Sequence, residues 1–306
     1  MRTAYLGTSE FAATVLREIA TGPHRPALVL TPPDRPRGRG RRLGSPPAAE
    51  AARELGIELL QADDVNAGDV PETLAAEADA AVLCAFGQLV AEPLLSSLEI
   101  LNVHPSLLPR WRGAAPIERA IMAGDAATGV CIIRLTAGLD EGPVALRREE
   151  PIGADDDYGT LAGRLATIAG ELLGTALDRR AAGDLRFEEQ ADDGVTYADK
   201  IAPGERRIDP WADAEEQARR IRALTPHIGA FAMLADGSRL GLRTPTVVAA
   251  GPGVGEFAAT DEGLFLGCGA GAIRLGAVQP EGGRWMDSSD YLRGRGLPEA
   301  VARPAG

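Results

Sequence analysis

The chain has 306 residues, of which 45% are hydrophobic and 25% are charged, and this is enough for two globular domains with sizeable cores. Its formal net charge of −12 argues against a nucleic-acid partner, although the acidic excess lies within residues 1–200. No run approaches the roughly 20 apolar residues of a transmembrane helix, and Gly7 to Glu10 interrupt the first apolar run. We therefore expect no signal peptide and no membrane partner.

The cysteine content points to a reducing compartment. Cys84, Cys131 and Cys268 stand far apart and form no C-x-x-C pair. We interpret them as buried, reduced thiols and expect a cytoplasmic protein.

The first third of the chain alternates strands with helices. After a strand at Thr3 to Leu6, Gly7 to Ser9 form a turn into a helix from Glu10 to Ala20. A G-x-G-x-x-G fingerprint is absent, which makes a dinucleotide site improbable. Such alternation is typical of a mostly parallel sheet with helices on both faces. The further elements expected here are strands at Pro26–Thr31, Glu58–Leu60 and Ala78–Phe86 and a helix over residues 48–56.

A basic loop follows the second strand, with the sequence P-P-D-R-P-R-G-R-G-R-R-L-G-S-P-P. Its density of Gly and Pro predicts neither helix nor strand. The loop could be a solvated connection. It is also the strongest basic cluster of an acidic region, and arginines on a flexible loop can contact phosphates. Its arginines are Arg35, Arg37, Arg39, Arg41 and Arg42.

Two polar side chains follow the apolar run from Leu98 to Leu101. Asn102 and His104 are two positions apart, so on an extended chain they point the same way. Pro105 favours extended backbone at His104. Because ligands bind at the carboxyl ends of strands in open α/β sheets, we expect an amide and an imidazole to converge at a ligand site.

The remaining chain divides into the end of this domain, a linker and a second domain. Asp140 lies in a tight loop, Gly138 to Gly142, and residues 183–205 have the polar, Gly- and Pro-rich composition of a linker. Short strands at regular spacing then predict a small antiparallel barrel. Before the linker we expect a helix from Ile117 to Ala123, a strand at Val130–Leu135 and a helix at Gly159–Ala182. After it we expect a helix at Ala212–Ala223 and strands at Phe231–Ala235, Arg239–Leu242, Val247–Ala249, Gly263–Leu266 and Ile273–Val278.

The run N-V-H-P-S-L-L-P-R-W-R-G-A-A-P-I, which starts at Asn102, resembles the signature of the folate-dependent formyltransferases, and among them of those that act on methionyl-tRNA. A-G-L-D-E-G-P-V at residues 137–144 matches the family's later Asp motif. The resemblance extends from L-G-T-S-E-F at Leu6 to R-W-M-D-S-S-D-Y-L near the end. It implies a Rossmann-like formyltransferase domain with a mostly parallel sheet at 1–183, a linker at 184–205 and an OB-like barrel at 206–306.

The resemblance also implies a catalytic triad of Asn102, His104 and Asp140. The first two would donate hydrogen bonds to the oxyanion, and Asp140 would orient the imidazole and help to remove the amine's proton. The formyl donor would be 10-formyltetrahydrofolate, and no metal is expected. Residues implied to line the folate site are Ser106, Leu107, Leu108 and Pro109, with Phe86, Gly87 and Gln88 beside the pterin.

The acceptor implied is the α-amino group of methionyl initiator tRNA, formylated in translation initiation. The pattern D-R-P-x-G-R-G-x-x-L resembles the loop with which such enzymes contact the acceptor arm. We expect a monomer. Two alternatives remain: a formyltransferase for a sugar-nucleotide amine or glycinamide ribonucleotide, and a non-catalytic tRNA-binding module. The arginine loop and the tail domain argue against the first alternative, and the intact triad argues against the second.

Overall fold

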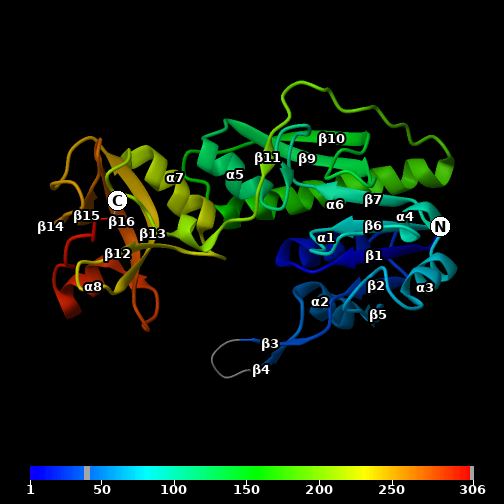
Figure 1. Cartoon of the computed structure of the whole chain (residues 1–306), viewed down its shortest axis with the longest axis horizontal. Helices are drawn as coiled ribbons and strands as arrows, with labels where there is room; N and C mark the ends of the chain where they lie inside the picture. Colours follow the sequence, from blue (N-terminus) through cyan, green and yellow to red (C-terminus); the bar gives the residue numbers. More distant parts are fainter. Residues whose placement is uncertain (38–41, 304–306) are drawn as a thin grey trace. The chain divides into compact units, whose positions relative to one another are not determined.

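The computed structural model describes residues 1–37 and 42–303, and the chain forms two compact units (Figure 1). The first unit consists of Met1–Pro116, Ala127–Pro151 and Ala162–Asp199. The second consists of Ile117–Ala126, Ile152–Leu161 and Lys200–Gly306. The domain limits that we drew from the sequence, at 183 and 205, stay predictions.

The first unit is built on a seven-stranded sheet. Its strands are β1 (Thr3–Gly7), β2 (Leu28–Thr31), β5 (Glu58–Gln61), β6 (Ala80–Cys84), β7 (Ile100–His104), β9 (Ala127–Arg134) and β10 (Val144–Pro151). They lie in the order β10-β9-β7-β6-β1-β2-β5. The five strands from β7 to β5 run parallel, whereas β9 is antiparallel to both of its neighbours. The predicted α/β class with a mostly parallel sheet is confirmed.

Helices cover both faces of this sheet because its side chains alternate in direction. Leu6 packs with Leu74 and Leu94 in one buried cluster. Tyr5 points to the other face, where its hydroxyl donates a hydrogen bond of 2.7 Å to the carbonyl of Ala12. The helices of this unit are α1 (Glu10–Ala20), α2 (Pro47–Leu55), α3 (Val70–Glu77), α4 (Leu94–Ser97) and, from Ala162 onward, α6 (Tyr158–Ala182).

The first helix has the predicted bounds, and local chemistry explains them. The Ser9 hydroxyl accepts a hydrogen bond from the amide of Ala12 and so caps the amino end of α1. The next helix, α2, ends at Gly56, whose φ of +63° is the left-handed conformation that a helix C-cap often needs.

The basic loop begins and ends as a short hairpin, which the sequence analysis did not expect. β3 (Arg35–Arg37) pairs antiparallel with β4 (Arg42–Gly44). The prediction that Gly and Pro exclude strands is wrong for these residues. A two-stranded ribbon has two free edges, so it tolerates Pro36, which has no amide hydrogen to donate.

Several further elements escaped the sequence patterns, and α3 and β10 show why. Helix α3 is short, with only Val70, Pro71 and Leu74 buried, which is too little to display a helical period. Strand β10 lies at the edge of the seven-stranded sheet, where β9 is its neighbouring strand. Its sequence V-A-L-R-R-E-E-P carries charges that edge strands commonly expose, so it lacks the apolar run of a buried strand.

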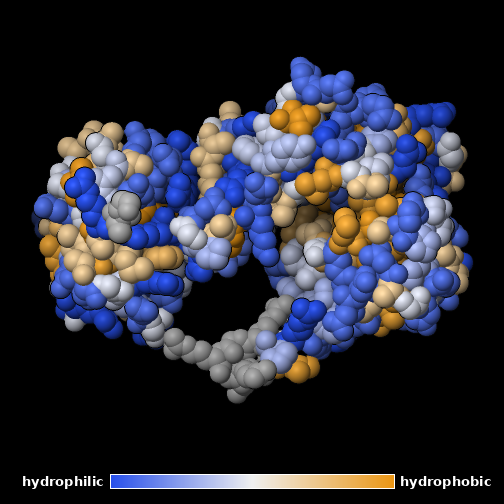
Figure 2. All heavy atoms as spheres, viewed as in Figure 1, coloured by the Kyte–Doolittle hydropathy of each residue, from blue (hydrophilic) through white to orange (hydrophobic). Residues whose placement is uncertain are grey.

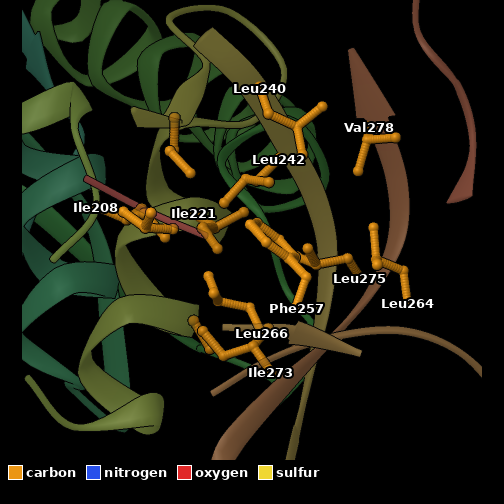
Figure 3. Packing of buried hydrophobic residues seen from close by; sticks show 14 of the residues in the cluster. Ile208, Ile221, Leu240, Leu242, Phe257, Leu264, Leu266, Ile273, Leu275 and Val278 are labelled. Carbon is orange, nitrogen blue, oxygen red and sulfur yellow. The ribbon is translucent and has the colours of Figure 1, made fainter. Parts of the chain in front are cut away.

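The second unit combines helices with an antiparallel sheet. The sheet order is β12-β13-β16-β15-β14, and β17 pairs with β16, in agreement with the predicted small OB-like barrel. Its core gathers Ile221 with Leu240, Leu242 and Leu266, all at most 1% exposed (Figure 3). The elements are α5 (Pro116–Ala123, from Ile117), a 3-10 helix η1 (Pro203–Arg206), α7 (Ala214–Leu224), β12 (Ala230–Met233), β13 (Arg239–Val248), β14 (Phe257–Thr260), β15 (Gly263–Gly267), β16 (Ala272–Pro280), β17 (Met286–Asp287) and α8 (Ser288–Arg295).

One strand of this sheet replaces two predicted ones. We expected a break between Leu242 and Val247, where the sequence contains Pro245. Instead β13 continues, with Pro245 opposite Leu275 of β16. The proline is tolerated because β12 pairs with Arg239 to Leu242, and among the described residues no strand pairs with that side of β13 beyond Leu242.

The described residues contain no helix that combines the length and hydropathy needed to cross a bilayer. On the face that Figure 2 shows, hydrophobic residues occur as separate patches among hydrophilic ones. The large hydrophobic side chains that are exposed include Leu89 and Leu139, at 76% and 57%.

Candidate active site

Strand β7 delivers the two polar residues that the sequence placed together. It lies between β6 and β9 near the middle of the sheet. Asn102 and His104 are 5% and 4% exposed, so both are buried polar side chains that need hydrogen-bond partners.

The loop between β9 and β10 supplies a common partner, Asp140. The Asn102 amide nitrogen donates a hydrogen bond of 3.0 Å to Asp140 Oδ1. The backbone amide of Gly113 donates one of 2.8 Å to Oδ2, and His104 Nδ1 lies 3.5 Å from the same oxygen. The structure therefore brings Asn102, His104 and Asp140 into one cluster, in which the carboxylate faces the imidazole.

The second ring nitrogen of His104 forms a hydrogen bond with the backbone. His104 Nε2 lies 2.9 Å from the backbone carbonyl of Trp111. A carbonyl can only accept, so Nε2 carries a hydrogen and donates it. Nδ1 is then the ring nitrogen that faces the Asp140 carboxylate.

Both backbone groups that hold this cluster come from an unusual stretch of chain. Trp111 has a φ of +66°, which side-chain-bearing residues rarely adopt, and Gly113 has a φ of +122°. A Cβ atom on Gly113 would lie 2.9 Å from the carbonyl oxygen of Ala198, so only glycine fits this position. Gly113 belongs to β8 (Arg112–Gly113), which pairs in parallel with β11 (Tyr197–Ala198).

Residues of the predicted folate-lining segment after His104 make hydrogen bonds and packing contacts within the protein. The Ser106 hydroxyl donates to the carbonyl of Arg110 at 2.6 Å, and the Ser106 amide donates to the carbonyl of His104. Leu108 is 3% exposed and packs in a small core cluster. Leu107 packs beside Gly129, where a Cβ atom would lie 2.5 Å from it. A folate-binding role for Ser106, Leu107, Leu108 and Pro109 stays a prediction.

The segment after β6 is organised in a similar way. Phe86 is 1% exposed and belongs to the main core, while Gly87 is exposed with a φ of +80°. Gln88 accepts a hydrogen bond from the Val65 amide at 2.8 Å and donates to the carbonyl of Ala62. These contacts shape the loop, and a pterin-binding role for Phe86, Gly87 and Gln88 stays a prediction.

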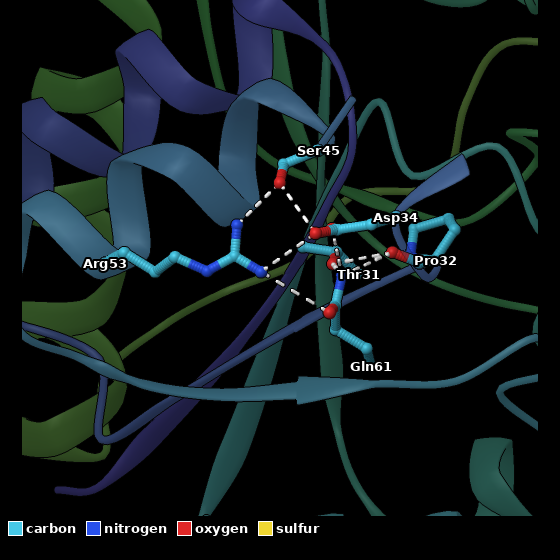
Figure 4. A network of polar contacts seen from close by, with 6 residues as sticks. All are labelled: Thr31, Pro32, Asp34, Ser45, Arg53 and Gln61. Carbon is cyan, nitrogen blue, oxygen red and sulfur yellow. Dashed lines mark hydrogen bonds and ion pairs between the residues drawn. The ribbon is translucent and has the colours of Figure 1, made fainter. Parts of the chain in front are cut away.

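The base of the basic loop is held by a polar network (Figure 4). Asp34 accepts hydrogen bonds from Gln61 and Ser45, both at 2.9 Å, and forms an ion pair with Arg53 at 3.3 Å. Hydrogen bonds from Gln61 and Ser45, together with the Arg53 charge, lower the pKa of Asp34 below its ordinary value of 3.8.

The arginines themselves lie beyond this network. Arg35 pairs with Asp63 at 3.1 Å on the surface. The backbones of Arg37 and Arg42 are paired across the hairpin. Arg39 and Arg41 fall outside the described residues. Phosphate binding by all five stays a prediction.

Thiol chemistry does not contribute to the candidate site. Cys84, Cys131 and Cys268 are buried and unpaired with one another. Burial raises the pKa of Cys84 to about 12 and that of Cys268 to about 11, so neither is a thiolate near neutral pH.

Sequence reasoning missed four supports of the triad: the carbonyl of Trp111, the amide of Gly113 and the side chains of Gln190 and Thr196. The backbone groups carry no side-chain signal. Gln190 and Thr196 lie in the segment with the composition of a linker, and in the structure the residues up to Asp199 pack with the first unit.

Comparison with protein families matches both parts of the chain. Residues 1–177 match the family described as formyl transferase, and residues 200–296 match the formyl transferase C-terminal domain. Among solved structures, HypX from Aquifex aeolicus in complex with tetrahydrofolic acid superposes with a TM-score of 0.66 and 18% identity. The alignment covers 100% of this chain and 50% of HypX, and it shows a shared fold.

Closer relatives cover nearly the full length. The methionyl-tRNA formyltransferase of Jannaschia sp. is 42% identical over 297 residues, which are 96% of this chain and 97% of the relative. That of Halorhodospira halophila is 40% identical over 309 residues, covering 97% of each. Identity at this level along both units means that the chain belongs to the methionyl-tRNA formyltransferase family.

Proposed function

We propose that this protein transfers a formyl group from 10-formyltetrahydrofolate to the α-amino group of methionyl initiator tRNA during translation initiation. The observation that carries the proposal is a buried Asn-His-Asp cluster in a chain that matches methionyl-tRNA formyltransferases along nearly its whole length. The folate-bound HypX structure, which shares the fold, supports the choice of formyl donor.

Asn102 stabilises the charge that develops on the formyl oxygen. Its amide nitrogen carries two hydrogens, and Asp140 takes one of them. The second can be donated to the oxygen while Asp140 fixes the orientation of the amide. Loss of such a pre-placed donor typically reduces kcat about 10²- to 10³-fold.

His104 and Asp140 accept and supply protons during the transfer. The attacking amine must lose a proton as the new C–N bond forms, and the leaving nitrogen of the folate must gain one as the old bond breaks. Asp140 presents a carboxylate beside Nδ1 of His104, so the pair can accept the first proton and supply the second. The Trp111 carbonyl keeps Nε2 out of this exchange.

Residues of the basic loop provide charge for the tRNA backbone. Arg35, Arg37, Arg39, Arg41 and Arg42 occur within eight positions of an otherwise acidic region. Each arginine can pair with phosphate oxygens in a bidentate fashion. In keeping with this function we place the enzyme in the cytoplasm as a monomer, which sedimentation of the purified protein would check.

The decisive experiment offers the purified protein 10-formyltetrahydrofolate with three acceptors in parallel: methionyl initiator tRNA, glycinamide ribonucleotide and an amino-sugar nucleotide. We expect formyl-methionyl-tRNA as the product and no turnover of the other two. Formylation of either small acceptor without formylation of methionyl-tRNA would contradict the proposed function.

A further inference from the structure

The segment between α6 and the second unit packs against the triad. Its Glu188 exchanges two backbone hydrogen bonds with Val144 of β10, at 2.7 and 2.9 Å. Further along, β11 pairs with β8. Gln190 and Thr196 lie between these two points of attachment. Gln190 contacts Asp140, and Thr196 contacts Trp111.

Gln190 holds the loop that carries Asp140. Its side-chain nitrogen donates to the backbone carbonyls of Asp140 at 2.7 Å and of Gly142 at 2.8 Å. Its oxygen accepts two hydrogen bonds from the guanidinium of Arg112, at 3.1 and 2.9 Å. Because Arg112 can only donate, it fixes which end of the amide faces Asp140.

This loop needs such support because its backbone is strained. Asp140 has a φ of +51°, a conformation that costs a non-glycine residue free energy and persists only where surrounding contacts impose it. The amide of Gln190 supplies two of these contacts, on either side of Glu141. The position of the Asp140 carboxylate beside His104 therefore depends on Gln190.

Thr196 holds the opposite support. Its hydroxyl oxygen accepts a hydrogen bond of 2.9 Å from the amide of Trp111, and its carbonyl accepts one of 2.9 Å from the amide of Arg112. Trp111 is also in a strained conformation, with a φ of +66°. Its carbonyl is the acceptor for His104 Nε2.

We propose that Gln190 and Thr196 are positioning residues, which hold the two groups that orient the His104 ring. Gln190 acts through Asp140 on the Nδ1 side, and Thr196 acts through the Trp111 carbonyl on the Nε2 side. The inference rests on the proposed function, in which His104 and Asp140 exchange protons. It assigns a role in catalysis to a segment with the composition of a linker.

Two nearly isosteric substitutions test the proposal. Gln190→Glu keeps an acceptor for Arg112 but places a second acceptor against two carbonyls, and Thr196→Val removes only the hydroxyl acceptor. Because small displacements of catalytic groups can cost up to about 100-fold in rate, we expect kcat to fall about 10-fold or more in each variant. KM for both substrates should stay within about twofold, since neither residue binds substrate.

The matched control is Glu189→Gln, an exposed neighbour on the same segment, which should leave kcat unchanged. Thermal unfolding identifies any variant that fails to fold. If Gln190→Glu does not fold, Gln190→Met, which has a similar length and no donor, takes its place and should show the same loss of kcat.

A role exerted through His104 predicts that the effects do not add. In a His104→Ala background, measured in single turnover, Gln190→Glu and Thr196→Val should cause little further loss. If each substitution causes the same fold loss of rate in the His104→Ala background as in the wild type, the proposal is overturned, because the two residues then act elsewhere.

A readout without substrates separates this inference from the proposed function. We expect the ¹⁵N-¹H NMR signals of the His104 ring to move in Gln190→Glu and Thr196→Val and to stay in place in Glu189→Gln. Unchanged ring signals in both variants would refute the positioning role. A wild-type enzyme that fails to formylate methionyl-tRNA would contradict the function, yet moved ring signals would still support the positioning.

Discussion

At the scale of single residues, the site depends on how one carboxylate is shared. Asp140 accepts hydrogen bonds from Asn102 and from the amide of Gly113, and it also faces His104. The orientation of the Asn102 amide and that of the His104 ring are therefore coupled through the same side chain. Hydrogen bonds to a charged group are stronger than neutral ones, which makes this partly buried carboxylate an effective anchor for both.

Substitution of His104 tests the chemical step. In His104→Ala we expect kcat to fall about 10²- to 10⁴-fold, because in the proposed function the ring exchanges a proton during transfer. The dissociation constant for methionyl-tRNA, measured by filter binding, should change by less than about twofold, since the ring is buried at the end of β7 and does not belong to the basic loop proposed to bind tRNA. A loss of tRNA affinity that matches the loss of rate would contradict this assignment.

At the scale of elements, two polar networks hold parts of the fold in place. The hairpin β3–β4 is anchored at its base by Asp34, Ser45, Arg53 and Gln61, so the arginine-rich loop leaves the first unit from a defined point. In the second unit, Arg119 of α5 forms a two-pronged pair with Glu205 of η1, at 2.5 and 3.1 Å. The first network holds the base of the hairpin, and the second joins α5 to η1 within the second unit.

The arginine loop should be recognisable by its dependence on salt. Changing Arg37, Arg39 and Arg41 together to Ala should weaken tRNA binding and flatten the slope of log K against log salt by roughly one for each phosphate that the loop no longer neutralises. Arg2→Ala and Arg17→Ala provide a control, because both arginines already pair with surface carboxylates. A slope that stays unchanged in the triple variant would assign the loop to mere connection.

The joint in the second unit should respond to pH. Hydrogen bonds from Arg119 lower the pKa of Glu205 below its ordinary value of 4.5. A lowered carboxyl pKa stabilises the folded state fully above about 4.5 and loses this contribution as the pH falls through the lower folded value. Glu205→Gln should therefore reduce the free energy of unfolding by about 1 kcal/mol or less at pH 7, because the pair is partly exposed.

Denaturant titrations of the wild type and Glu205→Gln at a series of pH values provide the measurement. The difference between the two proteins should shrink below pH 4.5 and vanish in stronger acid. A difference that is constant from neutral pH into strong acid would mean that the Glu205 charge does not contribute.

At the scale of the whole molecule, each of the two units has a core of its own. The sheet of the first unit and the antiparallel sheet of the second are assembled around separate buried clusters. Cys84 and Cys131 lie in the first unit and Cys268 in the second, so the thiols report on both cores.

Thiol accessibility should therefore follow unfolding. We expect the native protein to react slowly with a thiol reagent at pH 8, because burial both shields the sulfur atoms and raises the pKa of Cys84 and of Cys268, to about 12 and about 11. In denaturant all three thiols should react rapidly. Fast reaction of one thiol in the native enzyme would reveal local opening, and mass spectrometry would show in which unit it occurs.

Much of the fold was accessible from local patterns. Short apolar runs, and the turn of small residues from Gly7 to Ser9, were sufficient to predict β1, α1, α2 and the central strands. Local patterns failed where the element was short or at an edge, as in α3 and β10. They also failed at β13, where partners on neighbouring strands decide whether Pro245 interrupts the strand.

By itself the sequence determined that Asn102 and His104 share one side of a strand, because side-chain direction along a strand depends only on spacing. It also determined the concentration of arginines in one loop. The tertiary structure alone decided what meets this pair. Asp140 reaches Asn102 across 38 positions, and Thr196 reaches Trp111 across 85. Such hydrogen bonds depend on how β8, β11 and the loop after β9 pack together, and no periodicity within a short window contains that information.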